Sequence, residues 1–188
     1  MEVKKYTKID FTASPLTKGE YEKCSFVSCN FLNFDLSDFK FYDCEFTGCN
    51  LSLAKLVHTA FGDVKFKDCK MLGLRFENCL DFGLVFSFEN CLLNDSIFFK
   101  MKIKKTVFKN CELHDVDFSQ TDLTEAVFAG CDLAKAKFDH TILEKADLRT
   151  SFNYALDPEF NKIKKAKFSL SAVSGLLAKY DIEIDRTN

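Results

Sequence analysis

Large apolar residues recur at every fifth position along most of the chain. The first series comprises Phe11, Leu16, Tyr21, Phe26, Phe31, Leu36, Phe41, Phe46, Leu51, Leu56, Phe61, Phe66, Met71 and Phe76. After a shift of two residues, it resumes as Phe88, Leu93, Phe98, Ile103, Phe108, Leu113, Phe118, Leu123, Phe128, Leu133, Phe138, Leu143 and Leu148. An α-helix has a period of about 3.6 residues and a strand a period of about 2, so neither one alone explains this spacing. The pattern predicts a different repeating element.

Small residues occupy the position two before most of these centres. They are Cys24, Cys29, Cys44, Cys49, Ala54, Thr59, Cys69, Cys91, Thr106, Cys111, Thr121, Ala126, Cys131, Ala136, Thr141 and Ala146. Residues two apart share one face of an extended segment, and the remaining step of three residues leaves room for a corner. With the polar positions facing water, the chain is predicted to wind as a coil of short strands and corners around an apolar axis.

The cysteines indicate how many units make one turn of this coil. Cys49 and Cys69 are separated by 20 residues, which corresponds to four units. The interval from Cys69 to Cys91 is 22 residues, one turn plus the two-residue shift, so the columns stay aligned. The six phenylalanines of one column are predicted to stack as a core ladder at the usual strand separation of about 4.8 Å. They are Phe26, Phe46, Phe66, Phe88, Phe108 and Phe128.

The two-residue shift falls near residues 77–87, within a predicted coil domain that spans residues 1–168. Irregular segments on rigid scaffolds often carry function, which makes Asp81 and Phe82 candidates for a recognition bulge. A purely structural bulge is the alternative. In that case either Phe82 or Leu84 would fill the missing centre.

Several units resemble the repeat of the pentapeptide-repeat family, which reads small residue, Asp or Asn, Leu or Phe, polar residue, variable residue. The closest are Cys-Glu-Leu-His-Asp (111–115), Thr-Asp-Leu-Thr-Glu (121–125), Cys-Asp-Leu-Ala-Lys (131–135) and Ala-Asp-Leu-Arg-Thr (146–150). The resemblance covers about residues 9–171. It implies an all-β solenoid, a right-handed quadrilateral β-helix, in agreement with the coil expected from the spacing.

The last twenty residues follow a different pattern. A single helical stripe is predicted after a Ser N-cap, formed by Leu170, Val173, Leu176, Leu177 and Tyr180. Residues 181–185, Asp-Ile-Glu-Ile-Asp, alternate like a short strand. This tail is similar to the C-terminal module of the quinolone-resistance (Qnr-like) group of the family. That resemblance implies that residues 169–188 join two subunits end to end as a homodimer. It further implies binding to a type II topoisomerase, DNA gyrase or topoisomerase IV, and its protection from quinolones.

Charge gives no global attraction to any partner. The chain carries 26 basic and 28 acidic residues, a formal net charge of −2. Residues 1–10 contain no apolar leader-like segment and no run of 18 apolar residues follows, so we expect a cytoplasmic protein with no membrane contact. No side of the coil is dominated by Asp and Glu, which argues against imitation of the polyanion DNA. Direct nucleic-acid binding is not expected. A scaffold for an unrelated protein partner is therefore the alternative function.

The candidate chemistry favours a binding protein over an enzyme. The nine cysteines form no Cys-x-x-Cys pair and lie apart from the histidines in the register, so we expect buried, reduced thiols and no metal or other cofactor. His58, His114 and His140 occupy outward positions, and a coil filled by Phe and Leu leaves no pocket for catalysis.

A lysine-rich stretch is the one remaining feature with candidate chemistry. It consists of Lys100, Lys102, Lys104, Lys105 and Lys109, and it is a candidate for contact with phosphate or an acidic protein surface. Asp122 and Glu125 lie one turn later on the same side. They are expected to neutralise part of this charge.

Overall fold

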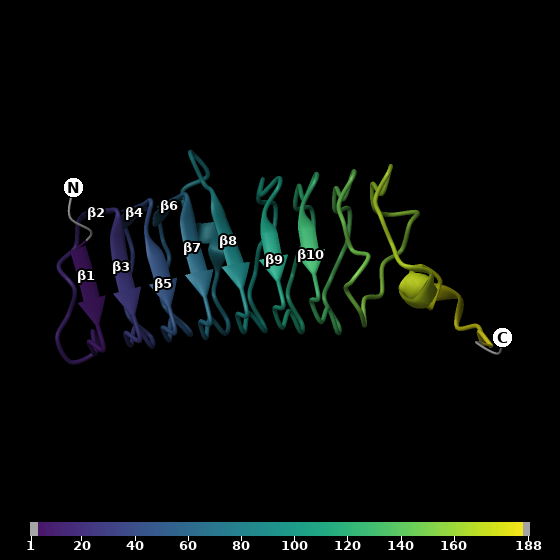
Figure 1. Ribbon diagram of the computed structural model, residues 1–188. Helices are drawn as coiled ribbons and strands as arrows, with labels where there is room; N and C mark the ends of the chain where they lie inside the picture. Colours follow the sequence, from purple (N-terminus) through teal and green to yellow (C-terminus); the bar gives the residue numbers. More distant parts are fainter. Residues whose placement is uncertain (1–3, 186–188) are drawn as a thin grey trace.

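The computed structural model describes residues 4–185 as a rod of stacked coils, which confirms the predicted right-handed quadrilateral β-helix (Figure 1). The first of its four walls is a parallel seven-stranded sheet with the order β1-β3-β5-β7-β8-β9-β10. Its strands are β1 (Lys4–Thr7), β3 (Cys24–Val27), β5 (Glu45–Thr47), β7 (Val64–Lys67), β8 (Phe86–Glu89), β9 (Val107–Lys109) and β10 (Val127–Ala129). We call this sheet wall 1 and number the other walls in chain order.

The remaining walls are narrower. Wall 2 is a ladder of isolated parallel bridges that includes Asn30, Asn50 and Lys70, and wall 3 is a similar ladder that includes Arg75 and Ile97. Wall 4 starts with a sheet of β2 (Glu20–Glu22), β4 (Lys40–Tyr42) and β6 (Ala60–Gly62), and continues further along the rod through bridges such as Lys102 to Asp122. A short 3₁₀ helix, η1 (Phe76–Asn78), follows the strand position of wall 3.

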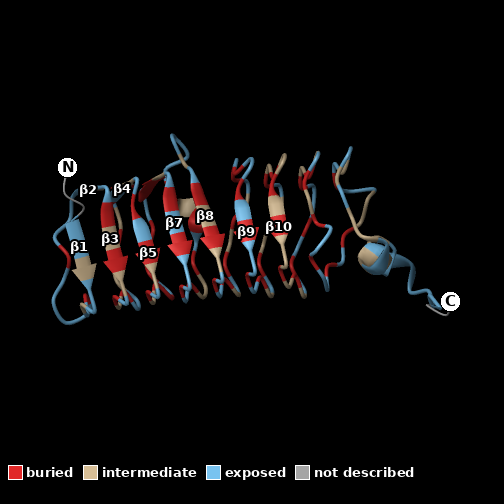
Figure 2. Ribbon diagram, in the orientation of Figure 1, coloured by how far each residue is buried: buried red, intermediate tan, exposed pale blue. Residues whose placement is uncertain are grey.

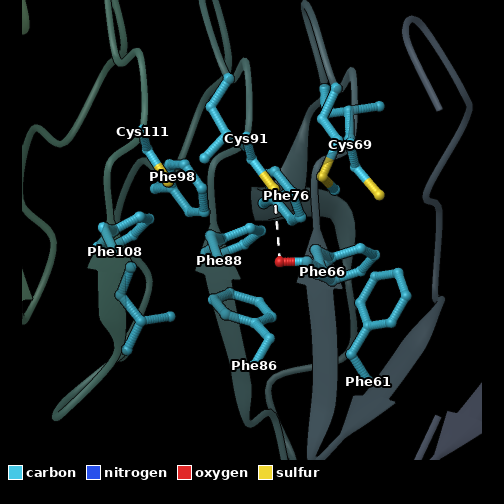
Figure 3. Close-up of a cluster of buried hydrophobic side chains, with 14 of the residues drawn as sticks. Phe61, Phe66, Cys69, Phe76, Phe86, Phe88, Cys91, Phe98, Phe108 and Cys111 are labelled. Atoms are coloured by element: carbon cyan, nitrogen blue, oxygen red, sulfur yellow. Dashed lines mark hydrogen bonds between the residues drawn. The ribbon is translucent and has the colours of Figure 1, made fainter. Parts of the chain in front are cut away.

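The apolar core runs along the axis, with buried and exposed residues alternating along each coil (Figure 2). Wall 1 holds the phenylalanine ladder, in which Phe88 stacks between Phe66 and Phe108 at centroid distances of 5.3 and 5.1 Å (Figure 3). A second ladder from wall 3 meets it edge-on, as between Phe98 and Phe108 at 6.0 Å and 88°. Stacked and edge-to-face pairs each add about 0.5–1.5 kcal/mol beyond area burial. The core is therefore held mainly by contacts between successive coils.

The corners explain the preference for Asp and Asn before each centre. In wall 3 the Oδ1 atom of Asp35 accepts a hydrogen bond from the backbone N–H of Ser37 at 2.9 Å, and in wall 4 Asp122 accepts one from Thr124 at 3.1 Å. Asn50 serves the same purpose for Ser52 at 3.2 Å. These side chains satisfy a turn N–H that the inter-coil ladder leaves open.

Low pH should therefore lower the stability of the folded rod. Hydrogen bonds from Ser37 hold the pKa of Asp35 below its ordinary value. Burial raises the pKa of Asp122, but hydrogen bonds from Thr124 and the contact with Lys104 together outweigh that effect and the net shift is downward. A carboxylate with a depressed folded-state pKa stabilises the fold above its unfolded pKa of about 3.9, and this contribution is lost as pH falls through the folded pKa. We expect the free energy of unfolding to fall between about pH 5 and pH 2.

The matched variants for this prediction are Asp35→Asn and Asp122→Asn. Asparagine keeps the acceptor oxygen, as it does at Asn50, and removes the titration. The double variant should show a shallower loss of stability with acid in urea titrations at several pH values. A slope identical to that of the unmodified protein would contradict this assignment.

The irregular segment of wall 4 leaves the strand ladder of wall 1 in register. Val64 pairs with Phe86, and Phe66 with Phe88, so the interval across this coil is 22 residues. Two extra residues are thus accommodated between Cys79 and Val85, and we call residues 79–85 the bulge. The chain there projects from the rod just before β8 (Figure 1).

The C-terminal segment differs from the sequence prediction in two respects, its helix type and its expected strand. Its helix is of the 3₁₀ type, in two pieces, η2 (Leu170–Leu176) and η3 (Ala178–Tyr180), and the Ser169 side chain makes no capping hydrogen bond to it. A 3₁₀ helix repeats every three residues and the pieces are offset at Leu177, so the α-helical stripe is not maintained.

The second correction concerns residues 181–185. They form no strand, because a strand needs a neighbouring strand and none lies beside them within the described residues. Residues 186–188, the end of the expected dimerisation module, and residues 1–3 lie outside the described part.

Candidate binding surfaces

The interior is filled, and its thiols have structural partners. All nine cysteines are buried and free. In the wall 2 column Cys49 Sγ donates to the carbonyl of Phe26 and Cys91 Sγ to that of Phe66, at 3.3 and 3.4 Å (Figure 3). Burial raises the pKa of the Cys44 thiol to about 11. The Cys44 thiol is therefore neutral at physiological pH, and the buried cysteines serve as small core residues.

The three histidines lie apart from one another on the surface. His114 Nε2 is 2.9 Å from Asp132 Oδ2, while His58 pairs with Asp38 at 3.4 Å and His140 with Asp139 at 2.8 Å. Each histidine contacts a different carboxylate. Within residues 4–185, no Ser, Thr or Cys side chain is hydrogen-bonded to any of the three histidine rings. Each histidine is therefore paired with a carboxylate near the surface. Within residues 4–185 no group of three or more His, Cys, Asp or Glu side chains is arranged to hold a metal ion.

The bulge is the most exposed apolar feature of the described rod. Phe82 is 98% exposed and Val85 56%. Leu84 instead packs against the core, so it fills the missing centre. The backbone N–H groups of Leu80 and Val85 donate to the carbonyls of Thr59 and Phe61, both at 2.9 Å. Both ends of the bulge are thereby fixed to the preceding coil, and Phe82 is held out on a rigid base. Asp81 is also exposed.

The lysine-rich stretch lies in the coil that follows the bulge. Lys104 pairs with Asp122 at 3.2 Å and Lys105 with Glu125 at 3.7 Å. Lys109 Nζ lies 2.8 Å from Glu89 on wall 1. Three of its five charges are therefore countered by neighbouring coils.

The C-terminal end of the rod presents a second apolar surface. Leu170 is 91% exposed, and Val173, Leu177 and Tyr180 are also exposed. Leu176 differs from these, because it packs against the core. Gly175 sits against Tyr154, and its carbonyl accepts a hydrogen bond from Leu156 N–H at 3.0 Å. The five residues of the expected stripe are thus divided between internal packing and an exposed surface.

One surface feature was missed by the sequence reasoning. Leu53 and Val57 are exposed at one corner of the rod and line a hollow with Gly73. The signal was present, because both are apolar residues at positions that the repeat assigns to solvent.

None of the helices within residues 4–185 is long and apolar enough to span a bilayer.

A coil with four walls, inward Phe and Leu centres and small residues two positions earlier defines a pentapeptide-repeat rod. The sequence matches the family model "Pentapeptide repeat region" over residues 19–86 and 75–148. The chain belongs to the pentapeptide-repeat family. No curated protein matches the sequence significantly.

Solved structures share this fold over nearly the whole chain. Trypsin-treated QnrB1, a plasmid-mediated fluoroquinolone resistance protein, superposes with a TM-score of 0.65 at 15% identity, covering 97% of this chain and 98% of that chain. HetL, a pentapeptide repeat protein involved in heterocyst differentiation regulation in the cyanobacterium Nostoc, gives 0.52 at 14% identity, covering 88% of this chain and 84% of that chain. At these identities the likeness is one of fold.

Proposed function

We propose that this protein is a non-catalytic binding rod that docks on a type II topoisomerase, DNA gyrase or topoisomerase IV, and protects it from quinolones. The observation that carries the proposal is the fold match to the fluoroquinolone resistance protein QnrB1 over 97% of the chain. The packed interior assigns recognition to the outer surface, where the bulge supplies one exposed aromatic anchor.

The contact expected at the bulge is an apolar socket on the partner. An aromatic ring that is 98% exposed buries its whole face on docking, and aromatic residues are typical binding hot spots. The fixed ends of the bulge reduce the entropy lost on binding. The near-neutral walls offer little imitation of DNA, so we assign recognition to shape and to this anchor.

The test is a DNA supercoiling assay with gyrase and a quinolone. The unmodified protein should raise the quinolone concentration needed for inhibition, and Phe82→Ala should lose at least about tenfold of this protection or of gyrase affinity. Phe152→Ala, which removes a half-exposed ring from wall 2, is the matched control and should behave as the unmodified protein. A protein that neither binds gyrase nor shifts quinolone inhibition would overturn the topoisomerase assignment.

We further propose that the C-terminal surface joins two copies of the rod. Leu170 makes no packing contact with the core, so Leu170→Asp should leave the fold intact and bury a charge only in a dimer. Light scattering should show a dimer for the unmodified protein and a monomer for Leu170→Asp. The double variant Leu176→Asp and Leu177→Asp should also be monomeric, with an additional loss of stability because Leu176 packs on the core. A dimeric Leu170→Asp protein would rule out this interface.

A scaffold for a different protein partner is the second candidate. The fold match to HetL, which is involved in a developmental process, and the absence of an acid-dominated wall favour it. Affinity capture with the unmodified rod and with Phe82→Ala in parallel distinguishes the two. A partner other than a topoisomerase that is lost with Phe82→Ala would establish the scaffold function.

A further inference from the structure

One corner of the rod breaks the rule that all others follow. Corner residues adopt a left-handed backbone conformation, and among residues 4–185 the non-glycine residues with positive φ are Lys, Asp, Asn, Ser, His, Gln or Glu, with the single exception of Leu53. Leu53 has a φ of 59° and is 55% exposed. This conformation is unfavourable for a residue with a bulky side chain, whereas Asn and Asp tolerate it well. A strained and exposed apolar residue raises the question of a function at that place.

The neighbouring corner is shaped to suit Leu53. In the next coil the equivalent residue is Gly73, with a φ of 64°, and a Cβ added there would lie 2.8 Å from Leu53 Cδ2. The Leu53 side chain therefore lies across a corner that carries no side chain. Gly73 keeps the space beside this leucine open.

Leu53 and Gly73 border a hollow on wall 3. Its volume is about 150 Å³, and Val57, which is 42% exposed, lines it as well. An apolar cavity of about 150 Å³ is large enough for benzene. The hollow therefore has room for one ring-sized or branched aliphatic side chain.

The two charged residues that line this hollow are basic, and one of them is paired with a carboxylate. Lys55 and Arg75 line it, and the residues that line it include no carboxylate. Arg75 pairs with Glu77 at 2.8 Å, and the Glu77 side chain is only 13% exposed, so that carboxylate is withdrawn from the surface. Lys55 is exposed, and its acidic neighbour is Asp35, which pairs with it in the wall 3 ladder and does not line the hollow. A ligand that enters here meets an apolar floor and the exposed ammonium group of Lys55 at the rim.

We propose that this hollow is a docking socket for a partner protein that inserts one apolar side chain next to a carboxylate. Leu53 and Val57 would contact the inserted side chain, and Lys55 would pair with the carboxylate. The socket lies on wall 3 and reaches the start of the bulge through Asn78, but no bulge residue lines it. This inference does not depend on the identity of the partner proposed above.

The decisive variant is Leu53→Asn, because it separates a binding role from a structural one. Asparagine suits the left-handed corner, so this variant should be more stable, with Tm raised by roughly 2–4 °C. It removes the wall of the socket at the same time. A residue that costs stability and supports binding is the signature of a functional site.

Phenylacetate serves as a minimal probe, since it carries a ring and a carboxylate. Titration of the ¹⁵N-labelled full-length protein should shift the amide signals of Leu53, Val57 and Gly73 with a dissociation constant on the order of 1–10 mM. Phenethylamine, with the same ring and the opposite charge, should bind at least about tenfold more weakly. Leu53→Asn should abolish the saturable shifts, and Lys55→Glu should weaken phenylacetate and favour phenethylamine.

Several outcomes would overturn the socket. They are the absence of saturable shifts with phenylacetate, equal binding of the two probes, and undiminished binding by a stable Leu53→Asn protein. None of these results bears on gyrase protection, which is tested through Phe82.

Discussion

Replacing Phe108 by alanine is expected to lower the free energy of unfolding by about 3–5 kcal/mol, the range for removal of a fully buried ring. Phe108 stacks on Phe88 at 5.1 Å and on Phe128 at 4.9 Å, so it joins three successive coils. Solenoid stability depends on contacts between neighbouring repeats, and this substitution weakens two interfaces at once. Urea unfolding followed by circular dichroism measures the effect.

Phe82→Ala is the matched control, since it deletes the same ring from a site that is 98% exposed. Its effect should stay within about 0.5 kcal/mol. If the two variants were equally stable, the axial position of Phe108 would be refuted.

Replacing Gly175 by alanine should release the C-terminal segment from the end of the coil. A Cβ at this position would overlap the carbonyl oxygen of Tyr154 and lie 2.7 Å from its Cδ2 atom. The backbone of η2 must therefore move, and the hydrogen bond from Leu156 to the Gly175 carbonyl is lost with it. We expect a loss of about 1–3 kcal/mol, as for other overpacked sites, and rapid proteolysis after residue 168.

Gly19→Ala provides the control for this variant. A Cβ at Gly19 meets no atom within 4 Å. Alanine restricts the unfolded chain more than glycine does, so Gly19→Ala should be neutral or slightly stabilising. Gly175→Ala with unchanged proteolysis would show that the segment does not dock through this glycine.

The five-residue register was sufficient to predict the body of the rod, because one physical rule applies at every coil. Each centre must be apolar to reach the axis and each residue two before it must fit beside it. The ladder of Phe66, Phe88 and Phe108 could therefore be placed from spacing alone, including the 22-residue interval. The turn-capping role of Asp and Asn, in contrast, is seen only in the hydrogen bonds of the structure.

Features outside the repeat could not be derived in this way. The register leaves open whether Phe82 or Leu84 enters the core, since both are apolar, and the backbone at Gly83, with a φ of 71°, directs Leu84 inward. The C-terminal segment has helical periodicity, but its contact with Tyr154 favours a tight 3₁₀ conformation. Residues 181–185 alternate like a strand, but no strand within residues 4–185 pairs with them.

The surface sites illustrate a second limit. Leu53 was visible as an apolar residue at a polar position, and the 20-residue turn places Gly73 beside it. Only the fold shows that a hollow lies there and that two basic residues line it. The bulge, in contrast, was predicted from the broken register. The five-residue periodicity thus identifies the residues that break the repeat. The structure of the coil shows which of these residues lie together in a candidate binding surface.

The accessibility of the nine thiols tests the central claim most directly. The cysteines are distributed from residue 24 to residue 131, and each is at most 7% exposed. An inward-facing thiol is shielded from reagents, and burial keeps the pKa of thiols such as Cys44 high. We predict that iodoacetamide at pH 8, followed by mass spectrometry, labels none of the nine in the folded protein within an hour and all nine in urea. Rapid labelling of several cysteines in the folded protein would contradict a coil with its small residues turned to the axis.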